Sequence, residues 1–295
     1  MKIRNAVITA VLLAVLPVFS ARAAVVINPL ADIVFVVDES GSMSGEHAWL
    51  GVMVSNLNTN LIGAGVTDAK FALVGFGNGQ GGNLGVNNLG RTLTDFTTVA
   101  GFQLADNNLV LTGGFEDGYS GINYAFNNLS FRTGAAMNIV LVTDEDRDNG
   151  NVGLTSASML QAFKNRSALL NVVVNNPFTA SGNTLLGVDS ALSGYQANGS
   201  GGFNKVANGV VGNGAGATET DYVALALATG GAGWDLNQLR AGGQTAASFT
   251  AAFTAIKVAE IINQPPSNNV PDSGMTIVLL LGSLAAIAGI RRRLA

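Results

Sequence analysis

The chain alternates between short apolar runs and longer segments in which apolar residues recur every three or four positions. The run at residues 33–37 is rich in β-branched residues and too short for a typical helix, which predicts a buried parallel strand. Similar runs predict strands at residues 70–76, 138–144 and 168–174, and an edge strand at 91–96. Helical spacing predicts helices at residues 46–60, 119–129, 156–166 and 245–262. This alternation predicts an α/β fold with a doubly wound, mostly parallel sheet flanked by helices.

The first apolar run ends abruptly in a polar loop that contains glycine. Asp38, Ser40 and Ser42 occupy alternate positions of this loop, and the helix predicted at 46–60 follows them. In doubly wound sheets, ligands bind outside the carboxyl ends of the strands. One carboxylate and two hydroxyls are hard oxygen donors, which suit Mg²⁺, Mn²⁺ or Ca²⁺ better than softer metals. The loop is therefore a candidate metal site.

The buried strand, the Asp38-x-Ser40-x-Ser42 pattern and the helix after it resemble the metal-ion-dependent adhesion site of von Willebrand factor type A domains. The resemblance covers about residues 32–262 and implies a Rossmann-like fold in which three loops hold one divalent cation, Mg²⁺ or else Mn²⁺ or Ca²⁺. It also implies that Ser40 and Ser42 bind the cation through their hydroxyls, and that Asp38 holds it directly or through water.

The second loop of such a site precedes a helix, as the segment before the helix predicted at 119–129 does here. Many members of the family supply a threonine from this loop, and some supply an acidic residue instead. Thr112, Glu116 and Asp117 are the rival candidates in this chain, and Glu116 is favoured. The alternative is that Glu116 and Asp117 only favour the positive start of the next helix.

The third loop of the resemblance begins where a later buried strand ends in Thr143-Asp144. Asp144 would supply the second carboxylate of the metal site. Four acidic residues lie within five positions here, and they repel one another unless a cation or Arg147 lies between them. A second cation, most suitably Ca²⁺, at Asp146 and Asp148 is one interpretation. A solvated acidic loop is the alternative, and it is the one we favour.

The N-terminal residues 1–23 have the features of a secretory signal peptide. Lys2 and Arg4 precede an apolar core, and the small residues Ala21 and Ala23 form an A-x-A cleavage site, which predicts cleavage after Ala23. The alternative is an uncleaved anchor, but the apolar core is short for a membrane span.

The C-terminal residues 270–295 combine a short motif, an apolar run and a basic tip. They consist of Val270, Pro271, Asp272, Ser273 and Gly274, the apolar run 275–290 and the arginines at 291–293. The run is of marginal length for a transmembrane helix, and the arginines would stay cytoplasmic. This order resembles the PEP-CTERM sorting tails in their VPDSG variant, which implies processing by an exosortase-type transpeptidase. A permanent membrane anchor is the alternative.

Between these ends, residues 24–263 suit one large domain rather than several. Residues 183–217 are rich in Gly, Asn and Ser, and we expect an insertion with little regular structure beyond one hairpin. The glycine-rich segment 77–90 is expected to be a surface loop, because no helix opens directly from it as in phosphate-binding loops. Residues 264–269 form a linker to the sorting tail.

Composition narrows the functional classes. Removing both ends takes away six of the 15 basic and one of the 19 acidic residues, which leaves a net charge near −9. Such a surface argues against a nucleic-acid partner and fits cation binding. The chain has no cysteine, which excludes disulfides, thiol catalysis and thiolate zinc sites. The sole histidine, His47, leaves neither a Ser-His-Asp triad nor a zinc cluster.

The resemblance implies an exported, non-enzymatic protein of the cell surface or extracellular matrix. Its cation would keep residual positive charge beside neutral hydroxyl ligands, and an open coordination position would accept a carboxylate from a partner protein or polysaccharide. Two alternatives remain. One is a metal-dependent hydrolase that uses the acidic residues 144–148. The other is a structural matrix protein whose metal site only stabilises the fold.

Overall fold

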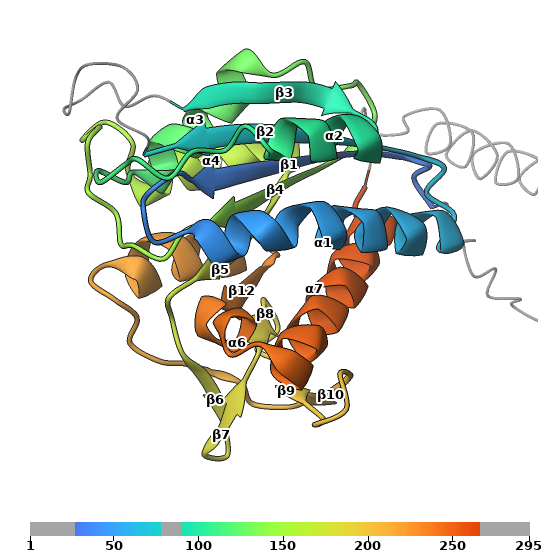
Figure 1. Cartoon of the computed structure of the whole chain (residues 1–295), viewed down its shortest axis with the longest axis vertical. Helices are drawn as coiled ribbons and strands as arrows, with labels where there is room; N and C mark the ends of the chain where they lie inside the picture. The colour runs from blue at the N-terminus through green and yellow to red at the C-terminus, as the bar shows by residue number, and fades with distance from the viewer. Residues whose placement is uncertain (1–26, 78–89, 266–295) are drawn as a thin grey trace, which may run out of the picture.

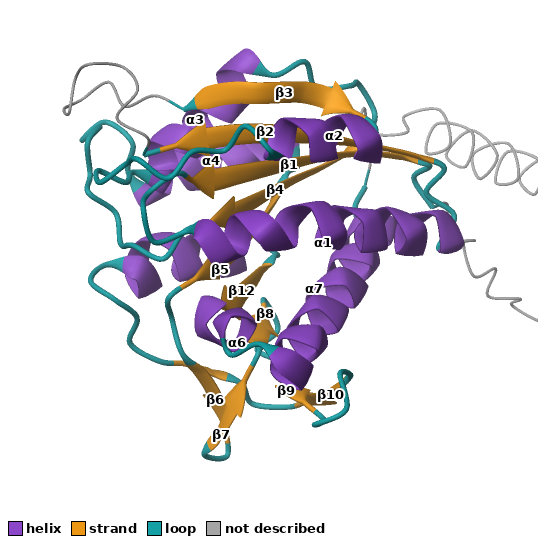
Figure 2. Cartoon of the chain, in the orientation of Figure 1, coloured by secondary structure: helices purple, strands orange, loops and turns teal. Residues whose placement is uncertain are grey.

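The computed structural model describes residues 27–77 and 90–265, which form one α/β domain around a nine-stranded sheet (Figures 1 and 2). The strands lie in the order β10-β9-β8-β12-β5-β4-β1-β2-β3. The five neighbours β12, β5, β4, β1 and β2 run parallel, whereas β3 and β8 to β10 are antiparallel additions at the two sides. This arrangement confirms the predicted fold class.

The long strands are β1 (Leu30–Asp38), β2 (Asp68–Phe76), β3 (Arg91–Thr97), β4 (Ala136–Val142), β5 (Leu169–Val174) and β12 (Ala232–Asp235). The short strands are β6 (Phe178–Ala180), β7 (Asn183–Leu185), β8 (Gly187–Asp189), β9 (Gly194–Ala197), β10 (Phe203–Val206) and β11 (Val210–Val211). The helices are α1 (Ser44–Gly63), α2 (Val99–Asp106), α3 (Gly118–Asn128), α4 (Ser156–Arg166), α5 (Ala224–Thr229), α6 (Leu236–Arg240) and α7 (Gly243–Asn263), with a π-helical turn η1 (Glu219–Val223) before α5.

Helices cover both faces of the sheet, because alternate residues of each buried strand point to opposite sides. In β1, Ile33 and Phe35 belong to the apolar core shared with α1, α2 and α7. Val34 and Val36 belong to the second core, shared with α3, α4 and α5. Both cores are built from many fully buried apolar residues of the described chain, which gives the domain an apolar interior on each face of the sheet.

Of the helices in the described part of the chain, α7 is the one long and apolar enough to cross a membrane. Phe249, Phe253 and Ile261 of α7 are buried in the first core, and Trp49 of α1 packs edge-on against both phenylalanines. These contacts identify α7 as a core helix of the domain. The predicted apolar span at 275–290 lies outside the described residues, as do the predicted signal peptide, the sorting motif and nearly all of the glycine-rich segment.

The insertion is more regular than expected, which corrects the prediction for residues 183–217. Strands β8, β9 and β10 extend the central sheet beyond β12, while β6, β7 and β11 form a separate three-stranded sheet. Tyr195 of β9 stacks on Trp234 of β12, with ring centroids 5.6 Å apart, and this contact fastens the extension to the first core. Strands of two to four residues are too short to show the alternation that identifies a strand in sequence.

Both ends of the described chain are fastened at the edge of the sheet where the parallel strands begin. The side-chain amide of Asn28 donates to the carbonyl of Gly134, 2.7 Å away, just before β4. The amide of Gln264 donates to the carbonyls of Met137 and Ser167, at 2.9 and 2.6 Å. The chain therefore enters and leaves the domain on the same side.

Asp106, the last residue of α2, is a site of local electrostatic strain. Its carboxylate is partly buried and lies at the negative end of the helix dipole, and its Oδ1 has no hydrogen-bond partner among the described residues. Burial raises the pKa of this carboxyl to about 6, although a hydrogen bond from the backbone of Gly51 lowers it in part.

Asp106→Asn should stabilise the domain above pH 6 and change little at pH 4. A raised folded-state pKa means that the carboxyl favours the fold while protonated and loses that contribution as the pH rises through about 6. Because solvent screens a partly buried charge, we expect a rise in melting temperature of only about 2–4 °C at pH 8. Thermal unfolding of both proteins at pH 4 and pH 8 measures this, and an equal difference at the two pH values would contradict it.

Candidate metal site

The candidate metal loops lie where the order of the strands reverses. Strands β1 and β4 are adjacent and parallel, but the chain continues from β1 to β2 on one side and from β4 to β5 on the other. Asp38 is the last residue of β1, and Thr143 and Asp144 directly follow β4. Loops that leave such a switch point diverge to opposite faces and open a crevice for ligands. The fold therefore brings the first and third predicted loops together.

Asp38 is fully buried at the base of this crevice. Its Oδ1 accepts the backbone N–H of Ser40 at 2.7 Å, and its Oδ2 accepts the hydroxyl of Thr143 at 2.8 Å. Burial, and to a lesser extent the charge of Asp144, raises the pKa of Asp38 to about 6. Its backbone carbonyl lies 2.8 Å from Nε2 of His47, so the sole histidine braces the loop rather than the carboxylate.

The two serines and Asp144 form a continuous chain of oxygen atoms. The hydroxyls of Ser40 and Ser42 are 3.2 Å apart, and the hydroxyl of Ser42 donates to Oδ1 of Asp144 at 2.9 Å. The structure therefore places three residues from two loops within hydrogen-bonding distance of one another, although Ser42 and Asp144 are 102 positions apart in sequence.

Glu116 joins this group from the second loop. Its side chain is buried, and the position that a Cβ on Gly77 would occupy lies 3.3 Å both from Oδ1 of Asp38 and from Cγ of Glu116. Burial raises the pKa of Glu116 to about 8, and the negative charges of Asp38 and Asp148 add to the rise. Its carboxyl therefore lies in an apolar and acidic environment next to Asp38.

The other two candidates of the second loop have different surroundings. Thr112 is exposed, but its backbone N–H donates to the carbonyl of Glu39 at 3.0 Å, so its loop lies beside the first loop. Asp117 is the N-cap of α3, accepts the N–H of Tyr119 and forms an ion pair with Arg147 at 2.9 Å. Both carboxylate oxygens of Asp117 thus have protein partners, as expected for a residue that starts a helix.

Asp146 and Asp148 use their carboxylates in separate contacts. Oδ2 of Asp146 accepts the N–H of Ala217, which fastens the end of the insertion to the third loop, and Oδ2 of Asp148 accepts the N–H of Glu116. Within the described residues, no three side chains of His, Cys, Asp or Glu are grouped closely enough to hold a metal by themselves. A metal at this edge would therefore depend on the serine hydroxyls.

Arg240 is a feature of the site that the sequence analysis missed. It lies at the end of α6, and its guanidinium contacts Oδ2 of Asp144 at 2.9 Å and Oε1 of Glu46 at 2.6 Å. It also donates to the carbonyl of Ser42 at 3.2 Å. The one signal in the sequence is that Arg240 follows the short strand β12 after a single short helix, because the ends of parallel strands share an edge. That signal does not indicate that the side chain of Arg240 contacts Asp144 and Glu46.

The sequence also gives no indication of the role of Glu39, the residue between Asp38 and Ser40. Its side chain is completely buried and forms an ion pair with Arg91 of β3, while the N–H of Val110 donates to Oε1 at 3.0 Å. Its backbone carbonyl accepts the N–H groups of Thr112 and Gly113. Glu39 therefore ties the second loop to the first.

The donor set fits a hard divalent cation. The two hydroxyls lie in contact with each other and with Asp144, and the buried carboxyls of Asp38 and Glu116 lie nearby. Oxygen ligands of this kind suit Mg²⁺, Mn²⁺ and Ca²⁺. Among the described residues, neither Asp38 nor Glu116 forms an ion pair, whereas Asp144 is paired with Arg240. Two buried carboxyls with raised pKa values and no basic partner are the environment that a cation would relieve.

The C-terminal segment matches a known sorting motif. Residues 269–294 match the VPDSG-CTERM motif, so the chain carries a C-terminal sorting signal of the exported, membrane-associated class. No curated protein sequence matches this chain.

Several solved structures are similar to the domain. An aerotolerance-related membrane protein from Bacteroides fragilis is 15% identical with a TM-score of 0.44, covering 79% of this chain and 98% of that one. Proximal thread matrix protein 1 from the mussel byssus, with a zinc-occupied MIDAS motif, is 15% identical with a TM-score of 0.36, covering 50% of this chain and 37% of that one. A von Willebrand factor type A protein from Catenulispora acidiphila is 17% identical with a TM-score of 0.35, covering 49% and 33%.

The chain thus spans about a third of the mussel and Catenulispora proteins that it matches. It combines a doubly wound α/β domain with a C-terminal sorting signal of the VPDSG-CTERM type.

Proposed function

We propose that the domain binds a divalent cation at the carboxyl edge of its sheet, in the manner of a metal-ion-dependent adhesion site. The observation that carries the proposal is the hydrogen-bonded chain from the hydroxyls of Ser40 and Ser42 to the carboxylate of Asp144, near two buried carboxyls that form no ion pair with the described residues. The serines and Asp144 would hold the cation directly, and Asp38 directly or through water. Mg²⁺ is the proposed cation, and Mn²⁺ and Ca²⁺ suit the same donors.

Glu116 is the proposed contribution of the second loop, because it is buried beside Asp38 whereas Thr112 is exposed. Asp117 is not included in the proposed shell, since the start of α3 and Arg147 use both of its carboxylate oxygens. A second cation at Asp146 and Asp148 stays a prediction.

The proposed activity is recognition of a carboxylate without turnover. Two of the donors are neutral hydroxyls, and an open coordination position on the cation would let a carboxylate of a partner protein or polysaccharide bind it directly. The acidic residues 144–148 would be needed as bases for hydrolysis. Asp146 and Asp148 are instead hydrogen-bonded to backbone N–H groups, and no observation favours the hydrolase alternative.

The proposed location is the cell surface or the extracellular matrix. The sorting signal at residues 269–294 supports export and processing by an exosortase-type enzyme, with the membrane as a temporary anchor. Carboxylate-rich polymers and proteins are available in both places, and the acidic composition gives no support for a nucleic-acid partner.

Calorimetric titration of Mg²⁺, Mn²⁺ and Ca²⁺ into residues 24–265 should show saturable binding by the wild-type domain. Asp38→Ala and Asp144→Ala should each abolish it, because each removes a carboxylate from the oxygen cluster. Asp68→Ala is the matched control, since Asp68 lies at the start of β2, on the opposite edge of the sheet. The proposed site is wrong if the wild type binds no cation or if Asp38→Ala binds as well as wild type.

The purified domain should bind to envelope and matrix fractions of the producing bacterium only while the cation is present. EDTA should release it, added Mg²⁺ should restore binding, and Asp38→Ala should bind no better than the EDTA-treated protein. Sedimentation with the fractions measures this, with Asp68→Ala as the control. If the cation raises the melting temperature while sedimentation ignores EDTA, the site has a structural role and adhesion is excluded.

Arg240→Gln should tighten cation binding by about tenfold. The guanidinium carries a positive charge 2.9 Å from Asp144 and therefore competes with a cation for that carboxylate. Arg240→Lys keeps the charge and should stay closer to wild type. The same titration measures both variants. Weaker binding by Arg240→Gln would mean that the guanidinium instead positions Asp144 for the cation.

A further inference from the structure

A second group of polar side chains is buried between α7 and the sheet, away from the candidate metal site. Lys257 of α7, Asn138 of β4 and Asn171 of β5 have no solvent exposure, and the side chain of Glu260 is only 10% exposed. A lysine without solvent exposure in an apolar core is costly, because its ammonium loses its hydration. The proposed function uses none of these residues.

The amine of Lys257 lies between a carboxylate and a carboxamide. Its Nζ is 2.7 Å from Oε2 of Glu260 and 3.2 Å from Oδ1 of Asn138. Oε1 of Glu260 has no hydrogen-bond partner among the described residues. The carboxamide of Asn138 is fixed from the other side, because its Nδ2 donates to Oε1 of Gln264 at 2.7 Å. A nucleophile, an electrophile and a base thus occupy one buried cluster.

The surroundings favour the reactive form of the amine. Burial lowers the pKa of Lys257, although the charge of Glu260 opposes the shift. The neutral amine is the nucleophilic form of lysine, and desolvation is a usual way to activate it. Because the fold already holds the two reacting groups in contact, the reaction does not have to meet the entropic cost of bringing them together.

We propose that Nζ of Lys257 attacks Cγ of Asn138 and forms an intramolecular isopeptide bond, with ammonia as the leaving group. The new C–N bond joins Nζ to Cγ, and the bond from Cγ to Nδ2 breaks. Glu260 accepts the proton that Nζ loses, and that proton leaves on the departing nitrogen. The reaction exchanges one amide for another, so it needs no oxidant, reductant or other reactant.

The neighbours of Glu260 suit this catalytic role. Nδ2 of Asn171 donates to Oε2 of Glu260 at 2.8 Å, while Oδ1 of Asn171 accepts the indole N–H of Trp234. Asn171 is therefore oriented by two partners, and its carboxamide oxygen is not directed at the amine. Asn138, whose oxygen does contact Nζ, is the electrophile that the geometry selects.

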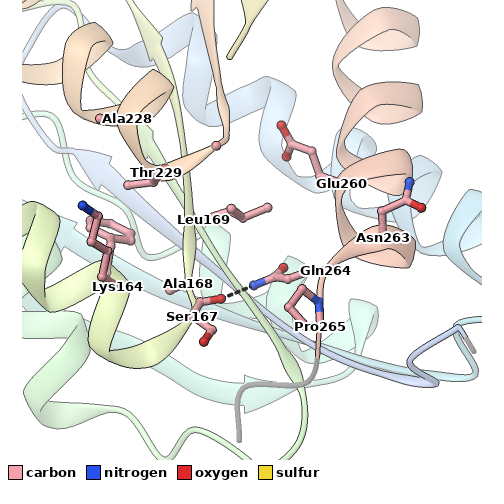
Figure 3. A pocket seen from close by; sticks show the side chains of 12 residues that line it. Lys164, Ser167, Ala168, Leu169, Ala228, Thr229, Glu260, Asn263, Gln264 and Pro265 are labelled. Atoms are coloured by element: carbon pink, nitrogen blue, oxygen red, sulfur yellow. Dashed lines mark hydrogen bonds between the residues drawn. The ribbon is translucent and has the colours of Figure 1, made fainter. Parts of the chain in front are cut away.

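Ammonia has a route out of the cluster. Glu260 and Gln264 line a surface groove of about 480 Å³ between the end of α7 and the segment around Leu169. Figure 3 shows both side chains extending from the same helix end, with Gln264 bonded to the carbonyl of Ser167. The leaving group would thus be released next to solvent.

The bond would link α7 covalently to the central strand β4. Lys257 and Asn138 are 119 positions apart, so the link closes a long loop and restricts the unfolded chain strongly. The chain has no cysteine and cannot gain this restriction from a disulfide. An exported protein with this bond would be covalently cross-linked without any redox chemistry.

Intact-mass spectrometry of residues 24–265 tests the proposal. The measured mass should be about 17 Da below the mass of the sequence, which is the loss of one ammonia. Because succinimide formation at an asparagine gives the same loss, tryptic mapping must find residues 133–147 joined to the peptide that begins at residue 241. A wild-type mass equal to that of the sequence, or a loss without the joined peptides, would overturn the proposal.

Variants assign the roles. Lys257→Met, Asn138→Ala and Glu260→Gln should each show their full sequence mass. Lys164→Met and Asn263→Ala are matched controls, because both residues line the same groove outside the cluster, and they should keep the loss of about 17 Da. Should Lys257→Met fail to fold, Glu260→Gln, which changes only the base, still decides. A joined peptide that persists in Glu260→Gln would show that Glu260 is not the catalyst.

Discussion

Two carboxyls, those of Asp38 and Glu116, are buried near each other at the carboxyl edge of the sheet, and neither forms an ion pair with a described residue. Their mutual repulsion and lost hydration oppose the fold, and their raised pKa values express that cost. The surrounding structure keeps them in place. Glu39 and Arg91 brace the first and second loops, and the sheet on both sides holds the strand ends at a fixed spacing. A bound cation would convert this unfavourable arrangement into a favourable one.

The two buried polar clusters of the domain, one at the carboxyl edge of the sheet and one between α7 and the sheet, differ in how their charges are compensated. At the carboxyl edge, the carboxyls of Asp38 and Glu116 would be neutralised by a cation from solution. Between α7 and the strands, the amine of Lys257 contacts both Glu260 and Asn138, and the carboxamide of Asn138 is hydrogen-bonded to Gln264. The first arrangement favours reversible binding of a ligand from solution, and the second favours a rigid attachment of the last helix.

The sequence predicts the sheet well because each of the central strands, which are six to nine residues long, contains a run of apolar residues that is buried on both faces. It also predicts that Asp38 and Asp144 meet, since both follow strands of one parallel sheet. The contact of Arg240 with Asp144 depends on how α6 packs, and nothing local to residue 240 encodes it. The short strands of the insertion are not predictable from alternation along the chain, because they are defined by pairing in space, β8 with β12, β9 with β8 and β10 with β9.

The chain enters and leaves the domain at the same edge, where Asn28 and Gln264 are fastened, and the candidate metal loops lie at the other. The strands between these edges rise about 3.3 Å per residue, which separates them by roughly 25 Å. An anchor on the C-terminal side therefore holds the domain by its base. The candidate metal loops then point away from the attachment point. A ligand on a facing surface would then meet these loops without any rotation of the domain.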